Sequence, residues 1–207
     1  MAEPRKPVSA PAYWEGLYAE RQDGWELGEP APSLKAWLAA GRSFSPGARV
    51  AVPGCGRGHD ARLLARHGFA VTGFDFAEAA LTEARQLAAR DQLPAVFECR
   101  DVFTLASDHG GAFDAVWEYT CFCAIDPDRR AEYARVLHDI LKPGGILLGC
   151  FYPLKEGTDG PPFPVSRQGI ETTLVPFFDI IEAGPPPASP ERRRGLEWLV
   201  RAERRAG

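Results

Sequence analysis

The sequence lacks the features that mark several large classes of protein. Its longest apolar runs, such as ILLGCF at 146–151, are far too short to span a bilayer, which takes about 20 residues. The formal charge is −4, so no excess of positive charge would attract nucleic acid or an anionic membrane. The opening stretch MAEPRKPVSAPA has no apolar segment typical of a secretory signal. We therefore predict a cytoplasmic, monomeric protein whose partner is a small molecule.

A pattern of metal ligands is also missing. The five cysteines are irregularly spaced, and no further Cys or His stands at the spacing of a zinc site, so we predict no metal. No His–Asp pair or pair of carboxylates stands near the predicted strand ends, which excludes an obvious general base. We interpret the four scattered histidines as surface residues: His59, His67, His109 and His138.

Alternation of strands and helices from residue 48 onward indicates the fold. We predict strands at 48–53, 69–75, 95–101, 113–119 and 145–153, and helices at 59–68, 77–91, 127–141 and 167–174. Two late strands, near 176–182 and 196–201, resemble an antiparallel hairpin at the edge of the sheet. The length of 207 residues suits one domain. The predicted fold is a single doubly wound, Rossmann-like α/β domain with a seven-stranded, mostly parallel sheet.

The residues before this alternation divide into two segments. Residues 1–11 are rich in proline, alanine and charge, and we predict that they are disordered. Residues 12–45 contain two predicted helices, one over 12–21 with an aromatic stripe and one from Ser33, as its N-cap, to Gly41. We place the main domain at 46–207.

Three glycines follow the first predicted strand, in AVPGCGRGHD at 51–60. Gly54, Gly56 and Gly58 follow the spacing G-x-G-x-G, whereas dinucleotide-binding folds usually have G-x-G-x-x-G. Asp75 ends the second strand about twenty residues later, where it could accept hydrogen bonds from a ribose diol, and we do not expect it in the core. The alternative is a tight turn with a solvent-facing aspartate.

An acidic residue also ends the third predicted strand. Asp101 could accept a hydrogen bond from the exocyclic amine of an adenine, and the apolar Val102 and Phe103 could enclose the ring. The alternative for Asp101 is a helix cap. Taken with the LKPGG turn at 141–145, these residues resemble those of methyltransferases that use S-adenosylmethionine.

Aromatic residues near the N-terminus make the resemblance more specific. The chain resembles the halide/thiocyanate/thiol methyltransferase group of the thiopurine methyltransferase family. The matching stretches are YWEGLYAERQDGWELGEPAPSL, VPGCGRGHD, VTGFDFAEAAL, DVF, FDAVWEYTCFCAIDPDRR, LKPGGILLGCFYP and GPPFPV. Together they run from about residue 13 to 202, so the resemblance covers nearly the whole chain.

The resemblance implies a role for each matching residue. It makes residues 12–45 a lid in which Trp14, Tyr18 and Trp25 cover the cofactor. The faces of aromatic rings attract the positively charged sulfonium of that cofactor. It assigns the methionine end to Gly54 and Gly56, the ribose to Asp75, the adenine to Asp101 and Val102, and a further cofactor contact to Tyr119. The sequence departs from the family pattern at two positions: Tyr18 replaces the Trp of plant relatives, and Glu118 replaces the usual Asp. Both replacements keep the chemical type, so they bear on the preferred substrate rather than on cofactor binding.

The residues that would bind the methyl acceptor are less clearly indicated by the sequence. Tyr152 ends the fifth predicted strand and is our candidate for a hydroxyl that orients an anionic nucleophile, with a residue capping the core as the alternative. The expected activity is methyl transfer to a thiol or thiolate, thiocyanate, hydrosulfide or halide, leaving S-adenosylhomocysteine. Thiopurine or aromatic-thiol methylation is the first alternative. An NAD(P)-dependent oxidoreductase and a non-catalytic cofactor binder are more remote alternatives.

Overall fold

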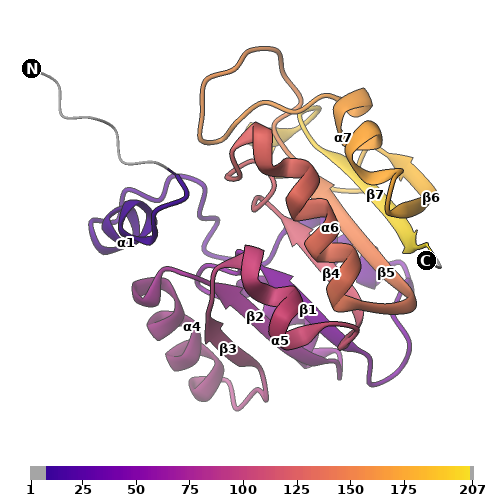
Figure 1. Cartoon of the computed structure of the whole chain (residues 1–207). Coiled ribbons are helices and arrows are strands. Elements are labelled where there is room, and N and C mark those ends of the chain that lie inside the picture. Colours follow the sequence, from indigo (N-terminus) through magenta and orange to yellow (C-terminus); the bar gives the residue numbers. More distant parts are fainter. Residues whose placement is uncertain (1–7, 206–207) are drawn as a thin grey trace, which may run out of the picture.

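Seven strands form one sheet in the order β3-β2-β1-β4-β5-β7-β6 in this computed structural model, which describes residues 8–205 (Figure 1). Their bounds are β1 (Arg49–Pro53), β2 (Ala70–Asp75), β3 (Val96–Cys99), β4 (Phe113–Tyr119), β5 (Leu141–Phe151), β6 (Phe178–Gly184) and β7 (Trp198–Arg204). The strands from β3 to β5 pair in parallel, whereas β7 pairs antiparallel with both β5 and β6. The predicted mostly parallel sheet with an antiparallel C-terminal hairpin is confirmed.

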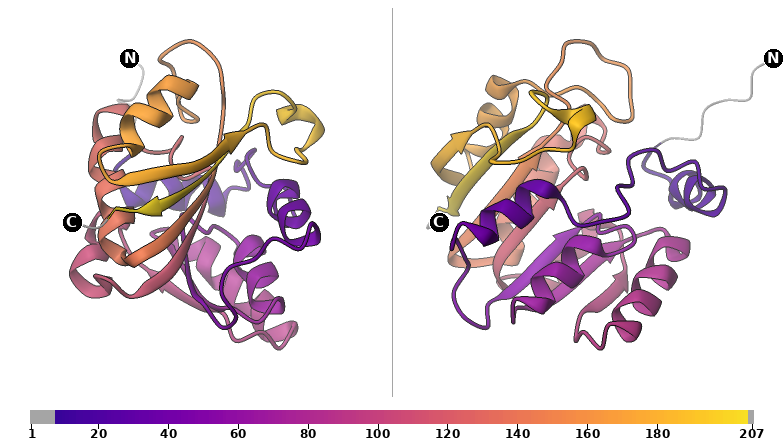
Figure 2. Two further views of the ribbon diagram at one scale, coloured as in Figure 1. Left: turned by 90° about the vertical axis from the view of Figure 1, so that its right-hand side faces the viewer. Right: turned by 180° about the vertical axis from the view of Figure 1, so that it is seen from behind.

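Helices cover both faces of the sheet. On one face lie α5 (Leu105–His109), α6 (Arg130–Ile140) and α7 (Arg167–Leu174), which stand in front of the sheet in Figure 1. On the other lie α2 (Pro32–Ala39), α3 (His59–Arg66) and α4 (Glu78–Arg90), seen from behind in the right panel of Figure 2. Helix α1 (Pro11–Ala19) packs against α4 and stands apart from the two layers (Figure 1).

The central strands explain this arrangement, because they are apolar on both faces. In β1, Val50, Ala51 and Val52 are all buried, as expected for a parallel strand covered by helices on each side. Alternate residues therefore join different cores, Ala51 with α6 and Val50 with α2 and α3. Within residues 8–205, none of the helices combines the length and the apolar character needed to cross a membrane.

The N-terminal predictions need correction. Residues 1–7 of the segment predicted to be disordered lie outside the described residues, but residues 8–10 form a turn and Pro11 begins α1. Helix α2 has Ala31 rather than Ser33 as its N-cap, because Pro32 occupies the first helical position. The buried side chains of α2 pack on the sheet, so only α1 and the loop after it are left to form a lid.

Some boundaries inside the main domain also differ from the prediction. Strand β5 begins at Leu141 rather than at residue 145, because the KPGG segment is accommodated as an irregularity in its pairing with β4. Pro127 begins a 3-10 turn, Pro127–Arg129, ahead of α6. The 3-10 turn Val102–Thr104 and α5 were not predicted, and a third 3-10 turn, Glu191–Arg193, precedes β7. The two late strands begin and end about two residues later than expected.

Candidate active site

A cavity of about 480 Å³ lies where the parallel strands end, a volume within the range of ligand-binding pockets. Its wall includes residues that follow β1 and β4, the two neighbouring strands between which the strand order reverses. In open α/β sheets this is the place where ligands bind. Every site residue predicted from the sequence lines this cavity: Trp14, Tyr18, Trp25, Gly54, Gly56, Asp75, Asp101, Val102, Tyr119 and Tyr152.

The glycine loop after β1 forms part of the cavity wall. Gly54, Gly56 and Gly58 have φ of 60°, 50° and 68°, a left-handed conformation that favours glycine. A Cβ at Gly54 would lie 2.7 Å from the Cβ of Cys121, and one at Gly56 would lie 2.8 Å from the hydroxyl oxygen of Tyr18. Glycine is therefore required at these two positions because other side chains of the protein approach the loop closely, and the same loop borders the cavity.

Asp75 joins the end of β2 to both the glycine loop and α4. One carboxylate oxygen accepts a hydrogen bond from the backbone N–H of Gly56 at 2.9 Å, and the other accepts one from Ala77 at 2.9 Å. The side chain is buried, contrary to the expectation that it lies outside the core, and burial raises the pKa of its carboxyl. Each oxygen keeps a second lone pair with which to accept a ligand hydrogen.

Asp101 performs the capping role that was its alternative interpretation, and it lines the cavity as well. Its carboxylate accepts a hydrogen bond from the backbone N–H of Phe103 at 3.0 Å and so caps the turn Val102–Thr104. The cap holds Val102 in the core and Phe103 in the cavity wall. Beyond Phe103 lies Arg129, with its guanidinium 3.4 Å from the ring centre.

Three aromatic rings from α1 and the following loop meet at the cavity. The ring centre of Trp25 lies 5.5 Å from those of both Trp14 and Tyr18, with the rings edge to face. The indole N–H of Trp25 is 3.3 Å from the hydroxyl oxygen of Tyr18, and the indole of Trp14 donates to the carbonyl of Val8 at 2.7 Å. Glu15, also on α1, accepts from the backbone N–H of Ala79 in the first turn of α4.

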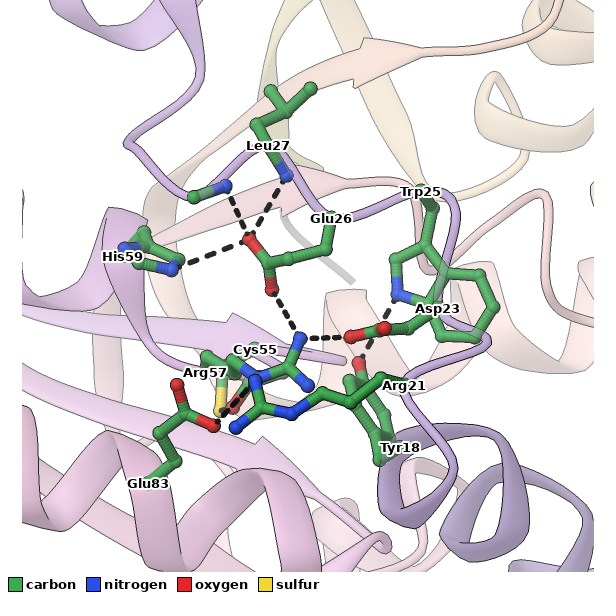
Figure 3. A network of polar contacts seen from close by, with 12 residues as sticks. Tyr18, Arg21, Asp23, Trp25, Glu26, Leu27, Cys55, Arg57, His59 and Glu83 are labelled. Atoms are coloured by element: carbon green, nitrogen blue, oxygen red, sulfur yellow. Dashed lines mark hydrogen bonds and ion pairs between the residues drawn. The ribbon is translucent and has the colours of Figure 1, made fainter.

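The loop that carries Trp25, residues 20–30, is called the lid loop below. Carboxylates of the lid loop converge on Arg57, which lies between two glycines of the glycine loop (Figure 3). On the opposite side, the guanidinium of Arg193 donates to the backbone carbonyl of Trp25 at 2.7 Å. The lid loop is thus attached to the body of the protein from two directions.

Arg193 also defines the far end of the cavity, and nothing in the sequence pattern had pointed to it. Only 2% of this residue is exposed, and its guanidinium lies 4.6 Å from the ring centre of Tyr152 and 5.3 Å from that of Tyr119. It donates to the hydroxyl of Tyr119 at 2.7 Å, and that hydroxyl donates in turn to the buried carboxylate of Glu197 at 2.7 Å. Burial raises the pKa of Tyr119, so the phenol stays protonated.

Arg193 and Glu197 escaped prediction because of where they stand in the sequence. They lie in the stretch ERRRGLEW, where the connection ends and the second late strand begins, and no local motif there marks a functional residue. The hairpin folds back beside β5 and brings them to β4, more than seventy residues earlier in the chain. Only the strand order could have revealed this.

The expectation that all four histidines lie on the surface is wrong for His59, which lines the cavity. Arg62 donates to its Nδ1 at 2.9 Å, so its Nε2 carries the hydrogen and faces Glu26 at 3.3 Å. Burial lowers the pKa of His59, so the imidazole is neutral. His109 and His138 are half-buried, each packed against phenylalanine rings, whereas His67 is exposed.

Two carboxylates, the half-buried Asp60 and the fully buried Glu118, brace the walls of the cavity. Asp60 accepts from the indole of Trp117 and from the backbone N–H of Ala31, each at 2.7 Å, and burial raises its pKa to about 6. Glu118, fully buried, accepts from the hydroxyl of Tyr133 at 2.6 Å and from the backbone of Phe122 at 2.8 Å. Burial raises the pKa of Glu118 to about 7.

Comparison with known proteins identifies the relatives of this chain. A family model described as thiopurine S-methyltransferase matches residues 9–203. Thiocyanate methyltransferase 1 of Arabidopsis thaliana is 32% identical over 191 residues, which cover 91% of this chain and 82% of that protein. A thiopurine S-methyltransferase of Pseudomonas entomophila (strain L48) is 31% identical over 198 residues, which cover 84% of this chain and 90% of that protein.

Solved structures give the same fold. The 1,6-didemethyltoxoflavin N1-methyltransferase of Burkholderia thailandensis, solved with its substrate and S-adenosylhomocysteine, superposes with a TM-score of 0.75. The match covers 100% of this chain and 94% of that one, at 19% sequence identity. At this identity the likeness establishes the fold alone.

Proposed function

Because the chain belongs to the thiopurine S-methyltransferase family and is a methyltransferase that uses S-adenosylmethionine, we propose that its acceptor is a small, soft anion. This class comprises thiolates, thiocyanate, hydrosulfide and halides. The family argues against the oxidoreductase and the non-catalytic binder as alternatives. The observation that carries the proposal is the buried guanidinium of Arg193 in the cavity wall.

The chemistry of the lining residues fits the cofactor. In this proposal the carboxylate of Asp75 accepts hydrogen bonds from the ribose hydroxyls through its remaining lone pairs. Asp101 accepts from the adenine amine, and Val102 packs against the ring. Tyr119 makes a further contact. The bare backbone at Gly54 and Gly56 borders the methionine end.

The aromatic cluster suits a sulfonium. Trp14, Tyr18 and Trp25 present ring faces and edges to the cavity, and an aromatic face attracts a cation by about 0.5–2 kcal/mol, depending on desolvation. Methyl transfer moves the positive charge off the sulfur. The rings therefore hold the charged cofactor more strongly than the neutral product.

Arg193 favours an anionic acceptor. A buried cation is costly unless an anion pairs with it, and within residues 8–205 Arg193 forms no direct ion pair with a carboxylate. Its link to Glu197 passes through the hydroxyl of Tyr119. An acceptor anion bound in the cavity beside Arg193 and within reach of the Tyr152 hydroxyl would complete the charge balance, and that hydroxyl would orient it.

The residues can promote the reaction without a strong base. When bound, the cofactor would supply a methyl group on a positively charged sulfur, a leaving group that becomes a neutral thioether on in-line transfer to the acceptor. The chain's contribution is to align the acceptor and to exclude water from it, since a desolvated anion is the better nucleophile. Thiocyanate, iodide and acidic thiols are already anions near neutral pH. His59 is neutral, its Nδ1 accepts from Arg62, and its Nε2 faces Glu26 at 3.3 Å.

Aromatic thiols, including thiopurines, are the second candidate acceptors. The Pseudomonas relative is named for thiopurine methylation, and Arg193 would pair equally well with an aromatic thiolate. The size of the acceptor distinguishes the two candidates. A cytoplasmic location and a monomeric state stay predictions.

A panel assay with labelled cofactor tests the proposal. Iodide, bromide, thiocyanate, hydrosulfide, a small aliphatic thiol and an aromatic thiol are offered separately. We expect turnover with the small anions and with the aliphatic thiol above that with the aromatic thiol. Preference for the aromatic thiol would support the second candidate. Turnover with none of the six, by a protein that binds S-adenosylhomocysteine, would refute the proposed acceptor class.

A further inference from the structure

Arg57 is an unexpected residue for its position. It lies between Gly56 and Gly58 in the loop that borders the cavity, yet only 5% of its side chain is exposed and it does not line the cavity. A long cationic side chain between two glycines normally extends into water. This one reaches the carboxylates of Asp23 and Glu26 in the lid loop (Figure 3).

Three carboxylates surround its guanidinium. Nη1 forms an ion pair with Asp23 and lies 3.4 Å from Glu26, and Nε donates to Glu83 at 2.8 Å. The guanidinium also lies 5.3 Å from the ring centre of Tyr18. Asp23 and Glu26 belong to the lid loop, Tyr18 to α1 and Glu83 to α4, so one side chain links three separate segments to the glycine loop (Figure 3).

The lid loop depends on Arg57 to neutralise the carboxylate of Asp23. Asp23 is 8% exposed, and its carboxylate has no hydrogen-bond donor other than Arg57 among the described residues. Removing one partner of a buried ion pair leaves an unpaired charge away from water, which is strongly unfavourable. Without Arg57 the least costly response is for the lid loop to carry Asp23 into solvent, and Trp25 moves with it.

We propose that Arg57 is a positioning residue that holds the lid loop, and with it Trp25, over the cofactor end of the cavity. Trp25 lies between the two lid-loop residues that Arg57 binds, Asp23 and Glu26. The inference rests on the proposed function in one respect, that Trp25 covers the cofactor. The attachment of the lid loop by Arg57 stands without it.

The test compares variants of the full-length protein by two measurements. One is the dissociation constant of S-adenosylhomocysteine by calorimetry. The other is the rate of limited tryptic cleavage after Arg21, whose side chain is 70% exposed at the start of the lid loop. Cleavage requires local opening, so its rate reports the position of the loop with no ligand present.

Arg57→Gln should open the loop. If the closed fraction falls from nearly one to about one tenth, the apparent dissociation constant rises about tenfold. Cleavage after Arg21 follows the open fraction, so its rate should rise by more than about tenfold. The turnover number at saturating cofactor should change less than the KM for cofactor. Arg57→Lys, which keeps the charge, should lie between Arg57→Gln and the wild type.

Two further variants separate positioning from general stability. Asp114→Asn is the matched control, since Asp114 pairs with Lys142 at 2.6 Å and accepts from the backbone N–H of Arg49 at 2.8 Å at the start of β4, the end of that strand opposite to the cavity. It should leave cleavage after Arg21 and cofactor affinity unchanged. Adding Asp23→Asn to Arg57→Gln removes the unpaired buried charge, so the double variant should bind S-adenosylhomocysteine more tightly than Arg57→Gln alone.

The outcomes distinguish this inference from the proposed function. Cleavage at the wild-type rate in a folded Arg57→Gln protein, or equal effects of Asp114→Asn, would overturn the positioning role. If Arg57→Gln does not fold, Asp23→Asn alone must accelerate cleavage for the inference to stand. A wild type that binds no S-adenosylhomocysteine would refute the proposed function, while the cleavage rates would still decide the role of Arg57.

Discussion

The guanidinium of Arg193 lies 4.6 Å from the ring centre of Tyr152, which places a buried cation and a phenol side by side in the cavity wall. Arg193→Gln removes the cation and leaves a shorter, neutral side chain that can still donate a hydrogen bond. A lost charge-assisted hydrogen bond is worth about 1.5–3 kcal/mol, so kcat/KM for thiocyanate or iodide should fall about 10- to 100-fold in steady-state assays.

The neighbouring exposed Arg194 supplies the control for this prediction. Arg194→Gln removes the same charge from the same 3-10 turn region without touching the cavity, and its kinetics should match the wild type. Arg193 also holds the carbonyl of Trp25, so a modest loss of S-adenosylhomocysteine affinity is expected. A loss of affinity as large as the loss of kcat/KM would place Arg193 at the cofactor end instead.

Tyr152→Phe tests the orienting hydroxyl alone, because the ring remains beside Arg193. If the hydroxyl donates a hydrogen bond to the anion, its removal costs about 1–2 kcal/mol and kcat/KM for the acceptor falls about tenfold. Calorimetry should show unchanged S-adenosylhomocysteine affinity. Unchanged kinetics with every acceptor would assign Tyr152 to the packing of the cavity wall.

Asp75→Ala should weaken both binding and folding. The loss of hydrogen bonds to the ribose reduces cofactor affinity about 10- to 100-fold by calorimetry. The backbone N–H groups of Gly56 and Ala77 also lose their acceptor, so the free energy of unfolding in urea should fall by about 1–3 kcal/mol. Wild-type affinity for S-adenosylhomocysteine would exclude Asp75 from the site.

Glu118→Gln should change how stability depends on pH. Burial raises the pKa of Glu118 to about 7 from an ordinary value of 4.5. Between these values the folded protein holds a proton that the unfolded chain has released, so the wild type's free energy of unfolding falls as pH rises. At 1.36 kcal/mol per pH unit this contribution reaches about 3 kcal/mol.

The glutamine variant lacks this contribution and keeps an oxygen to accept from Tyr133. Urea unfolding of both proteins at about pH 4.5 and pH 8 measures the difference, in which other groups such as Asp60 cancel. The stability of the wild type relative to Glu118→Gln should decline from the lower to the higher pH. A constant difference would show that Glu118 titrates normally.

The sequence predicted the sheet and the cofactor end of the cavity because both depend on local patterns. Strand periodicity, the glycine loop and the acidic residues at strand ends are each recognisable within a few consecutive residues. Gly54, Asp75 and Asp101 could therefore be placed at one edge of the sheet from their positions in the chain. Boundaries differ from the prediction where a proline or a bulge shifts them, as at Pro32 and Leu141.

The remaining features depend on contacts between distant parts of the chain. No local pattern distinguishes Arg57, and only the folded lid loop shows that it binds Asp23. Arg193 and Glu197 reach Tyr119 because β7 enters the sheet beside β5. Local sequence does not encode contacts between such distant residues, so neither the attachment of the lid loop nor the position of Arg193 beside Tyr152 could be predicted.

The position of β7 between β5 and β6 sets an order for building the protein on the ribosome. Chains emerge N-terminal end first, so the glycine loop, Asp75 and Asp101 leave the ribosome well before Arg193 and Glu197. Strand β6 has no partner until β7 arrives to lie between it and β5. The half of the cavity assigned to the cofactor is therefore synthesised first, and the half assigned to the acceptor is completed only when the hairpin inserts.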